Sequence, residues 1–119
     1  MKKIIILLVL PILLCACGAT EKATVENIDC TKKTELVNDG AVLIDVREAS
    51  EYQEGHLDGA ININYTDIAS KIETTVDKKD TKIVVYCKSG RRSSIAAKSL
   101  IDLGYTNVYD LGGMSNCKK

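Results

Sequence analysis

One short stretch of this chain combines residue types that can do chemistry together, namely Cys87, Lys88, Ser89, Gly90, Arg91 and Arg92. Neighbouring cations favour the thiolate form of a cysteine, and so does the N-terminus of a helix. Gly90 permits a left-handed or crowded backbone, so successive N–H groups can turn toward one anion. The stretch therefore predicts a nucleophilic Cys87 in a loop that binds a small anion.

The segments on either side of this loop predict how the fold presents it. Residues 83–86 form a continuous apolar run, which is typical of a buried strand. After the loop, apolar residues fall mainly on one face of a predicted helix, which Ser93 or Ser94 would cap. A free cysteine is more often an inert buried side chain. A glycine and three cations directly after a buried strand favour a reactive thiol instead.

The remaining segments predict an α/β fold. Strands are expected at residues 41–46, 60–63 and 107–110, and helices at 31–37, 49–53 and within 65–76, with Thr31 as the first N-cap. Long or helical segments separate successive strands, as parallel pairing requires. We therefore expect a doubly wound, mostly parallel sheet with helices on both faces. Such sheets bind ligands beyond the carboxyl ends of their strands, where Cys87 stands.

Three separated motifs resemble the rhodanese family and follow the family's order. Residues 43–48, 51–52 and 55–63 are similar to its first half, Cys87 to Arg92 fits C-x-x-G-x-R, and residues 103–114 look like its closing segment. The resemblance covers roughly residues 28 to 118. It implies a rhodanese-like five-stranded sheet, and it aligns Cys87 with the family's sulfur-carrying nucleophile.

The resemblance implies sulfurtransferase chemistry. Cys87 would take sulfane sulfur from thiosulfate or a similar anionic donor, held by the loop N–H groups with Arg91 and Arg92 while Lys88 adds charge. The resulting persulfide would pass its sulfur to cyanide or a thiol. The expected partners are thus a small anionic sulfur donor and a thiophilic acceptor, and the chain is expected to act as a monomer. No metal or organic cofactor is expected, because no second His or Cys stands at ligand spacing to Cys87.

Two other classes of function remain open. Phosphatases and arsenate reductases use a related cysteine loop, but such phosphatases typically place five residues between the cysteine and the arginine. Here Arg92 follows Cys87 after four residues, and the shorter loop favours sulfur as the transferred group. The second alternative is a persulfide carrier or binding module that does not turn over.

Asp45, Arg47 and His56 are interpreted as structural support for the site. A carboxylate and a guanidinium at a strand end more often brace neighbouring loops than take part in catalysis. His56 is the only histidine, but its position before a turn favours a hydrogen-bonded brace. A cysteine of low pKa also needs no general base.

The first 27 residues are expected to lie outside the folded domain. Residues 1–16 have a basic start, an apolar run and small residues before Cys17, a pattern similar to a bacterial lipoprotein signal peptide. The apolar run is shorter than the ~20 residues that an ordinary membrane-spanning helix needs. Cys17 would carry the lipid, residues 17–27 would form a tether, and residues 28–119 would form the rhodanese domain. The domain would then be exported and anchored outside the cytoplasmic membrane, at the cell surface or in the periplasm; secretion without a lipid is the alternative.

The balance of charge argues against nucleic acid as a partner. Removal of Lys2 and Lys3 with the signal peptide would leave 14 basic side chains against 16 acidic ones. The positive charge is instead concentrated near Cys87, which favours a small anion over a polyanion.

Cys117 marks a departure from the family, because rhodaneses commonly carry a tryptophan there. With Cys15 cleaved off and Cys17 lipidated, Cys30, Cys87 and Cys117 would remain, and an odd count in an exported domain suggests one disulfide and one free thiol. In the family's sheet the first short strand lies beside the last, which would bring Cys30 near Cys117. Three interpretations stay open: a Cys30–Cys117 disulfide, a Cys117 that resolves oxidised Cys87, and a substitution without consequence.

Overall fold

The computed structural model describes residues 23–117. Five strands and four helices alternate along this part of the chain, followed by a 3-10 helix. The elements are β1 (Glu26–Asn27), α1 (Cys30–Asn38), β2 (Val42–Asp45), α2 (Ala49–Glu54), β3 (Ile61–Asn62), α3 (Ile68–Thr75), β4 (Lys82–Cys87), α4 (Arg91–Asp102), β5 (Asn107–Gly113) and η2 (Met114–Cys117). From α1 onward, the predicted order of helices and strands is therefore correct.

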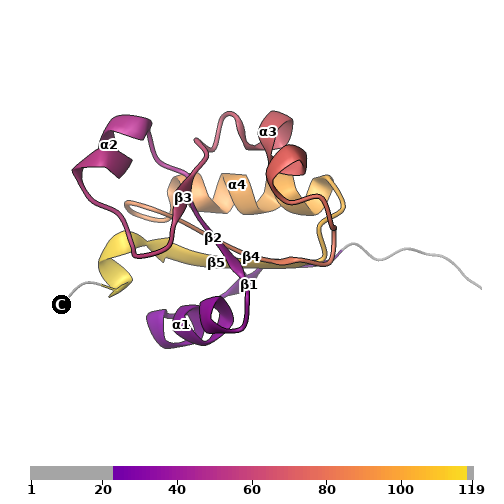
Figure 1. Ribbon diagram of the computed structural model, residues 1–119, viewed down its shortest axis with the longest axis horizontal. Helices are drawn as coiled ribbons and strands as arrows, with labels where there is room; N and C mark the ends of the chain where they lie inside the picture. Colours follow the sequence, from indigo (N-terminus) through magenta and orange to yellow (C-terminus); the bar gives the residue numbers. More distant parts are fainter. Residues whose placement is uncertain (1–22, 118–119) are drawn as a thin grey trace, which may run out of the picture.

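The described strands form one sheet in the order β1-β5-β4-β2-β3, and every pair within it is parallel. Figure 1 shows α1 on one face of this sheet and α3 and α4 on the other. In the same view, α2 and η2 lie beyond the end where the strands finish. The prediction of a five-stranded parallel sheet with helices on both faces is confirmed, and the central strand β4 carries Cys87.

The hydrophobic core is divided by the sheet into two clusters, and successive residues of β4 alternate between them. Ile83, Val85 and Cys87 belong to the cluster that includes residues of α3 and α4. Val84 and Tyr86 belong to the other, which includes Leu36 of α1. This alternation follows from the two-residue period of a strand. It places the Cys87 side chain on the face that α4 covers.

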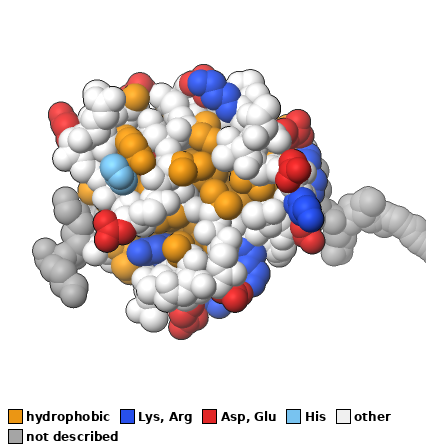
Figure 2. Space-filling view, in the orientation of Figure 1, with side chains coloured by type: hydrophobic (Ala, Val, Ile, Leu, Met, Phe, Trp, Pro, Cys, Tyr) orange, Lys and Arg blue, Asp and Glu red, His pale blue; other side chains and the backbone are white. Residues whose placement is uncertain are grey.

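The surface seen from the side of Figure 1 is divided by residue type. Figure 2 shows hydrophobic side chains gathered in the middle of this face and charged side chains mainly around its rim. Among the described residues, Ile61 of β3 is one of two large hydrophobic side chains classed as exposed, the other being Ile95.

Two predicted boundaries at the start of the domain are wrong. Helix α1 begins at Cys30 with Asp29, not Thr31, as its N-cap, because the Asp29 carboxylate accepts a hydrogen bond of 2.9 Å from the Lys32 N–H. The strand β1 also lies within the segment predicted as a tether. It pairs with β5 over only two residues, which is too short to give a periodic pattern in the sequence.

The last strand is longer than predicted because it contains a bulge. The register passes from Val85 opposite Asp110 to Tyr86 opposite Gly112, so Leu111 is the extra residue and β5 continues to Gly113. The predicted signal peptide and Cys17 lie outside the described residues. Within residues 23–117, no helix has the length and apolar character needed to cross a bilayer.

Candidate active site

Cys87 ends β4, and three loop residues separate it from the first residue of α4. Its side chain is fully buried. Gly90 is the N-cap of α4, and its φ of 106° lies in the left-handed region that favours glycine. This conformation turns the Gly90 N–H toward the Cys87 sulfur, at 2.9 Å from N to Sγ. The predicted role of Gly90 in shaping a loop of inward-facing N–H groups therefore agrees with the geometry.

Two opposing effects set the pKa of Cys87. Burial raises it, because the charged thiolate loses contact with water. Hydrogen bonds from the N–H and hydroxyl of Ser93, and from the N–H groups of Gly90 and Ser89, lower it by a larger amount in total, so the pKa of Cys87 falls below its usual value. The prediction that neighbouring cations activate the thiol is only part of the cause, because local hydrogen bonds contribute more.

Ser93 is a site residue whose role the sequence interpretation missed. The prediction that Ser93 or Ser94 caps α4 is wrong, because Gly90 holds the N-cap position and Ser93 is the third residue of the helix. Ser93 is fully buried, its hydroxyl donates to the Gly90 carbonyl oxygen at 3.1 Å, and it also lowers the pKa of Cys87. The sequence signal for this role was the position of Ser93 in the first turn of the predicted helix, which places its hydroxyl over the loop that precedes the helix.

Arg92, which was predicted to hold the anionic donor, is bound to a carboxylate of α2. Its Nη1 and Nη2 atoms lie 2.7 and 3.1 Å from the two carboxylate oxygens of Glu51, which gives a bidentate ion pair. The pair is only partly exposed, and it lowers the pKa of Glu51 to about 2. Glu51, which the sequence interpretation did not assign to the site, also accepts a hydrogen bond from the Glu48 N–H in a capping box. The ion pair therefore ties α4 to the start of α2.

Asp45 and Arg47 form a buried brace, in agreement with their predicted supporting role. Nε and Nη2 of Arg47 donate to the Asp45 carboxylate, and Nη2 also donates to the Gly55 carbonyl. The Tyr86 hydroxyl donates to Asp45 at 2.9 Å and accepts from the Leu57 N–H at the same distance. The bond to Asp45 raises the pKa of Arg47. The network as a whole fixes the segment after α2 to the central strand.

His56 lies in that same segment and contacts residues of α2. Its Nδ1 atom is 2.8 Å from the Tyr52 carbonyl oxygen, and its ring stacks on the Tyr52 ring with 3.7 Å between centroids. The side chain is otherwise exposed. These contacts agree with a structural role for His56.

A glycine pair at the end of β5 brings that strand close to the loop. Gly113 lies opposite Cys87 in the register, and a Cβ atom placed on Gly113 would stand only 2.7 Å from the Lys88 carbonyl oxygen. No side chain fits there without a backbone shift. The sequence signal for this close approach was the Gly112-Gly113 pair itself.

A pocket of about 360 Å3 opens beside the loop. Its walls come from α2, from the loop and from η2, and its lining residues are Arg47, Glu51, Glu54, Lys88, Met114 and Ser115. Ser89 and Arg91 are exposed but do not line it. A larger depression of about 470 Å3 beside β1 and α4 contains none of the predicted site residues. The smaller pocket is therefore the one that adjoins the predicted site residues, through Arg47 and Lys88.

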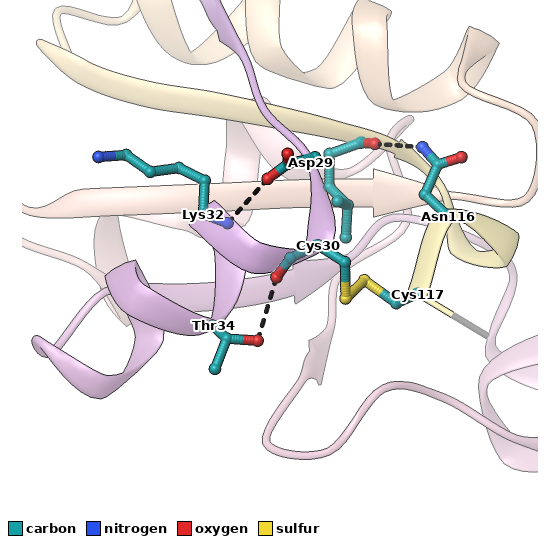
Figure 3. The surroundings of a disulfide bond; sticks show 7 residues. Asp29, Cys30, Lys32, Thr34, Asn116 and Cys117 are labelled. Atoms are coloured by element: carbon teal, nitrogen blue, oxygen red, sulfur yellow. Dashed lines mark hydrogen bonds between the residues drawn. A yellow bond between two sulfur atoms is a disulfide. The ribbon is translucent and has the colours of Figure 1, made fainter. Parts of the chain in front are cut away.

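Cys30 and Cys117 are joined by a disulfide, with 5.2 Å between their Cα atoms. Figure 3 shows this bond linking the first residue of α1 to η2. Cys117 packs against the core cluster on the α1 face, whereas Cys87 belongs to the cluster on the α4 face. Among the three cysteines of the described chain, Cys87 is the free one. The alternative that Cys117 resolves oxidised Cys87 disagrees with this arrangement.

The described residues contain no group of three or more His, Cys, Asp or Glu side chains that could hold a metal ion. The chemistry available to the site is that of a thiolate under backbone N–H groups. Such a site can attack an electrophilic sulfur or hold an anion.

Comparisons with known proteins agree on one family. A model of the rhodanese-like domain matches residues 30–119. Thiosulfate sulfurtransferase PspE of Escherichia coli is 41% identical over 73 residues, which are 61% of this chain and 70% of that protein. Putative sulfurtransferase YtwF of Bacillus subtilis is 43% identical over 72 residues, covering 60% and 68%. The solved structure of a rhodanese with anions from E. coli has 38% identity and a TM-score of 0.64, and the match covers 66% of this chain and 93% of that one.

Fold and loop together define a protein that presents a cysteine of lowered pKa at the carboxyl end of a central parallel strand. The chain belongs to the rhodanese-like domain family. Its relatives support a sulfurtransferase activity in general terms. The family resemblance derived from the three motifs is thereby confirmed.

Proposed function

We propose that this protein is a sulfurtransferase that moves sulfane sulfur from thiosulfate, or a similar anionic donor, through a persulfide on Cys87 to cyanide or a thiol. The observation that carries the proposal is the environment of Cys87. Its thiol is fully buried, yet hydrogen bonds from Ser93, Gly90 and Ser89 lower its pKa. A thiol that is activated in this way serves as a nucleophile.

The first step would form the persulfide. The Cys87 thiolate attacks the outer sulfur of thiosulfate, the bond between the two thiosulfate sulfurs breaks, and sulfite leaves with that bonding pair. The product is an anionic Cys87 persulfide, so the total charge of –3 is conserved. The N–H groups around Cys87 would stabilise the negative charge. Arg92 is held by Glu51, so among the cations of this loop Lys88 and Arg91 are the more open to the donor.

The second step would return the free thiolate. A nucleophilic acceptor attacks the outer sulfur of the persulfide, the sulfur–sulfur bond breaks, and Cys87 leaves as a thiolate. With cyanide as the acceptor the product is thiocyanate, and with a thiol it is a new persulfide. The family membership and the relatives named thiosulfate sulfurtransferase support both steps.

Intact-mass measurement tests this proposal directly. The purified protein is stripped of bound sulfur with cyanide, desalted without a thiol reductant so that the disulfide stays intact, and mixed with thiosulfate. We expect a gain of one sulfur atom that cyanide removes as thiocyanate, and no gain in Cys87→Ser. A stable adduct that cyanide discharges only slowly would identify a carrier. Hydrolysis of a phosphate ester without a sulfur adduct would identify an oxyanion enzyme.

We also propose that the domain is exported and anchored by a lipid on Cys17. The Cys30–Cys117 disulfide supports export, because disulfides persist mainly in oxidising compartments. In a bacterial host the protein should incorporate labelled palmitate and enter the detergent phase. Cys17→Ser should abolish both, whereas Cys15→Ser should not; equal labelling of Cys17→Ser would overturn the anchor.

A further inference from the structure

The pocket beside Cys87 has a charge pattern that the transfer of sulfur from thiosulfate to cyanide does not require. Two cations, Arg47 and Lys88, and two carboxylates, Glu51 and Glu54, line it. Thiosulfate is a dianion, so carboxylates at the entrance oppose its approach. The pattern therefore indicates another ligand.

Two of these four charges are already paired inside the protein. Arg47 is bound to the buried Asp45 carboxylate, and Glu51 is bound to Arg92. Neither side chain can turn to a ligand without breaking a bidentate or multiply bonded contact. Arg47 and Glu51 therefore form part of the walls of the pocket, and their charges are balanced within the protein.

The other two charges have no ion-pair partner among residues 23–117. Lys88 lies directly after Cys87 and is exposed, and Glu54 ends α2 and is also exposed. They do not pair with each other, although both line the same pocket. The pocket thus offers one positive and one negative group that are open to a ligand.

The third wall of the pocket comes from η2 and differs in character. Met114 follows Gly113 directly, packs against the core cluster on the α1 face and lines the pocket. A flexible, polarizable thioether suits contact with a methylene group or a sulfur atom. Figure 1 shows η2 at the same end of the sheet as α2, with the loop from β4 to α4 also at that end.

We infer that the acceptor is a small zwitterionic thiol, such as an amino-acid thiol, whose ammonium group meets Glu54 and whose carboxylate meets Lys88. This inference rests on the proposed function and assigns the specificity of its second step to these two residues. The thiolate of the acceptor attacks the outer sulfur of the Cys87 persulfide, the sulfur–sulfur bond breaks, and the Cys87 thiolate leaves. The product is a persulfide of the small thiol, and no additional oxidant or reductant is needed.

A series of four thiols that differ in charge tests this inference. Full-length protein in mild detergent is loaded with sulfur and discharged by L-cysteine, cysteamine, 3-mercaptopropionate or 2-mercaptoethanol, which carry both charges, a positive one, a negative one and none. The rate of each variant is divided by the wild-type rate for the same thiol, which cancels the reactivity of the thiol itself.

We expect charge-selective changes of roughly two- to fivefold, as partly exposed ion pairs allow. Glu54→Gln should slow discharge of the persulfide by L-cysteine and by cysteamine. It should leave discharge by 2-mercaptoethanol unchanged and should not slow discharge by 3-mercaptopropionate. Lys88→Met should slow discharge by L-cysteine and by 3-mercaptopropionate but not discharge by cysteamine. Both effects should appear in the KM for the thiol and shrink in concentrated salt. Glu26→Gln and Lys33→Met, which change charge outside the pocket, should leave all four ratios near one.

Equal ratios for all four thiols in Glu54→Gln and Lys88→Met would overturn the inference while leaving the proposed function intact. The proposed function fails separately, at the loading step. If thiosulfate does not load Cys87 but inorganic polysulfide does, the proposed donor is wrong and the charge series still decides on the acceptor. If neither compound loads Cys87, the proposed function and this inference are both wrong.

Discussion

At the scale of single residues, the reactivity of Cys87 depends on donors from the first turn of α4. A backbone N–H is removed only by substitution to proline, which also constrains the backbone, whereas alanine removes the Ser93 hydroxyl alone. It is buried, donates to the Gly90 carbonyl and lowers the pKa of Cys87. Ser93 is therefore the side chain through which the pKa of the thiol can be tested.

Ser93→Ala should raise the pKa of Cys87. The hydroxyl stabilises the thiolate, and a hydrogen bond to a charged group contributes roughly 1.5–3 kcal/mol, so its loss should shift the pKa upward by about one to two units. Alkylation by iodoacetamide across a pH series should then be slower at neutral pH and should converge with the wild type at alkaline pH. Ser94→Ala is the matched control, because Ser94 is exposed and does not bond to the thiol. An unchanged alkylation midpoint in Ser93→Ala would contradict this assignment.

The residues that could be predicted from the sequence were those whose signal is local. Cys87 and Gly90 stand three positions apart between a strand and a helix, so their spacing alone indicated an anion-binding loop. The pairing of Arg92 with Glu51 joins residues that are 41 positions apart. Spacing carries no information on a contact of that kind, and Arg92 was therefore assigned to the donor.

At the scale of elements, the loop is fixed from two sides, by the end of β5 and by α2. The first contact is a close backbone approach between Gly113 and Lys88. The second is the ion pair between Arg92 of α4 and Glu51 of α2. The parallel pairing of the strands could be predicted from the long connections between them. The two-residue strand β1 and the bulge at Leu111 could not be predicted, because neither leaves a periodic pattern in the sequence.

Gly113→Ala should disturb the thiol more than the fold. The added Cβ would lie 2.7 Å from a backbone oxygen of the Cys87 loop, so the loop has to move and the N–H groups lose their alignment with the sulfur. We expect the yield of the Cys87 persulfide to fall severalfold in intact-mass measurements. Gly59→Ala is the contrasting control, because Gly59 has a φ of 84° but open space around it. That variant should lose stability and keep the persulfide yield; the opposite result would contradict the role of Gly113.

Glu51→Gln should lower stability in a pH-dependent way. The folded pKa of Glu51 is about 2 against an ordinary 4.5, so its ion pair stabilises fully above pH 4.5 and loses this contribution as the pH falls toward 2. Glutamine keeps the capping geometry of α2. Urea unfolding should show a loss of about 1 kcal/mol at neutral pH that shrinks below pH 4.5. Glu54→Gln, on the same helix without an ion pair, should show no such trend. A loss that does not vary with pH would contradict this account.

At the scale of the whole molecule, the disulfide joins two distant parts of the chain at the edge of the sheet. Cys30 begins α1, directly after β1, and Cys117 ends η2, directly after β5. The strands β1 and β5 pair over two residues only. The covalent bond therefore holds together an edge that few hydrogen bonds secure. It also holds η2, which supplies Met114 and Ser115 to the pocket.

Replacing both Cys30 and Cys117 with serine should destabilise the protein without removing its nucleophile. The bond spans a sequence separation of 87 residues, and the chain-entropy model gives up to about 4.6 kcal/mol for so long a loop. We expect a clear fall in Tm and a severalfold rise in the KM for the acceptor, because η2 would no longer hold Met114 against the pocket. Cys87 should still gain one sulfur from thiosulfate, because it lies on the opposite face of the sheet from Cys117. Equal stability of the double variant, together with alkylation of all three cysteines in the native unreduced protein, would contradict the disulfide. Loss of the persulfide in the double variant would instead mean that this bond acts in the chemistry and not only in the fold.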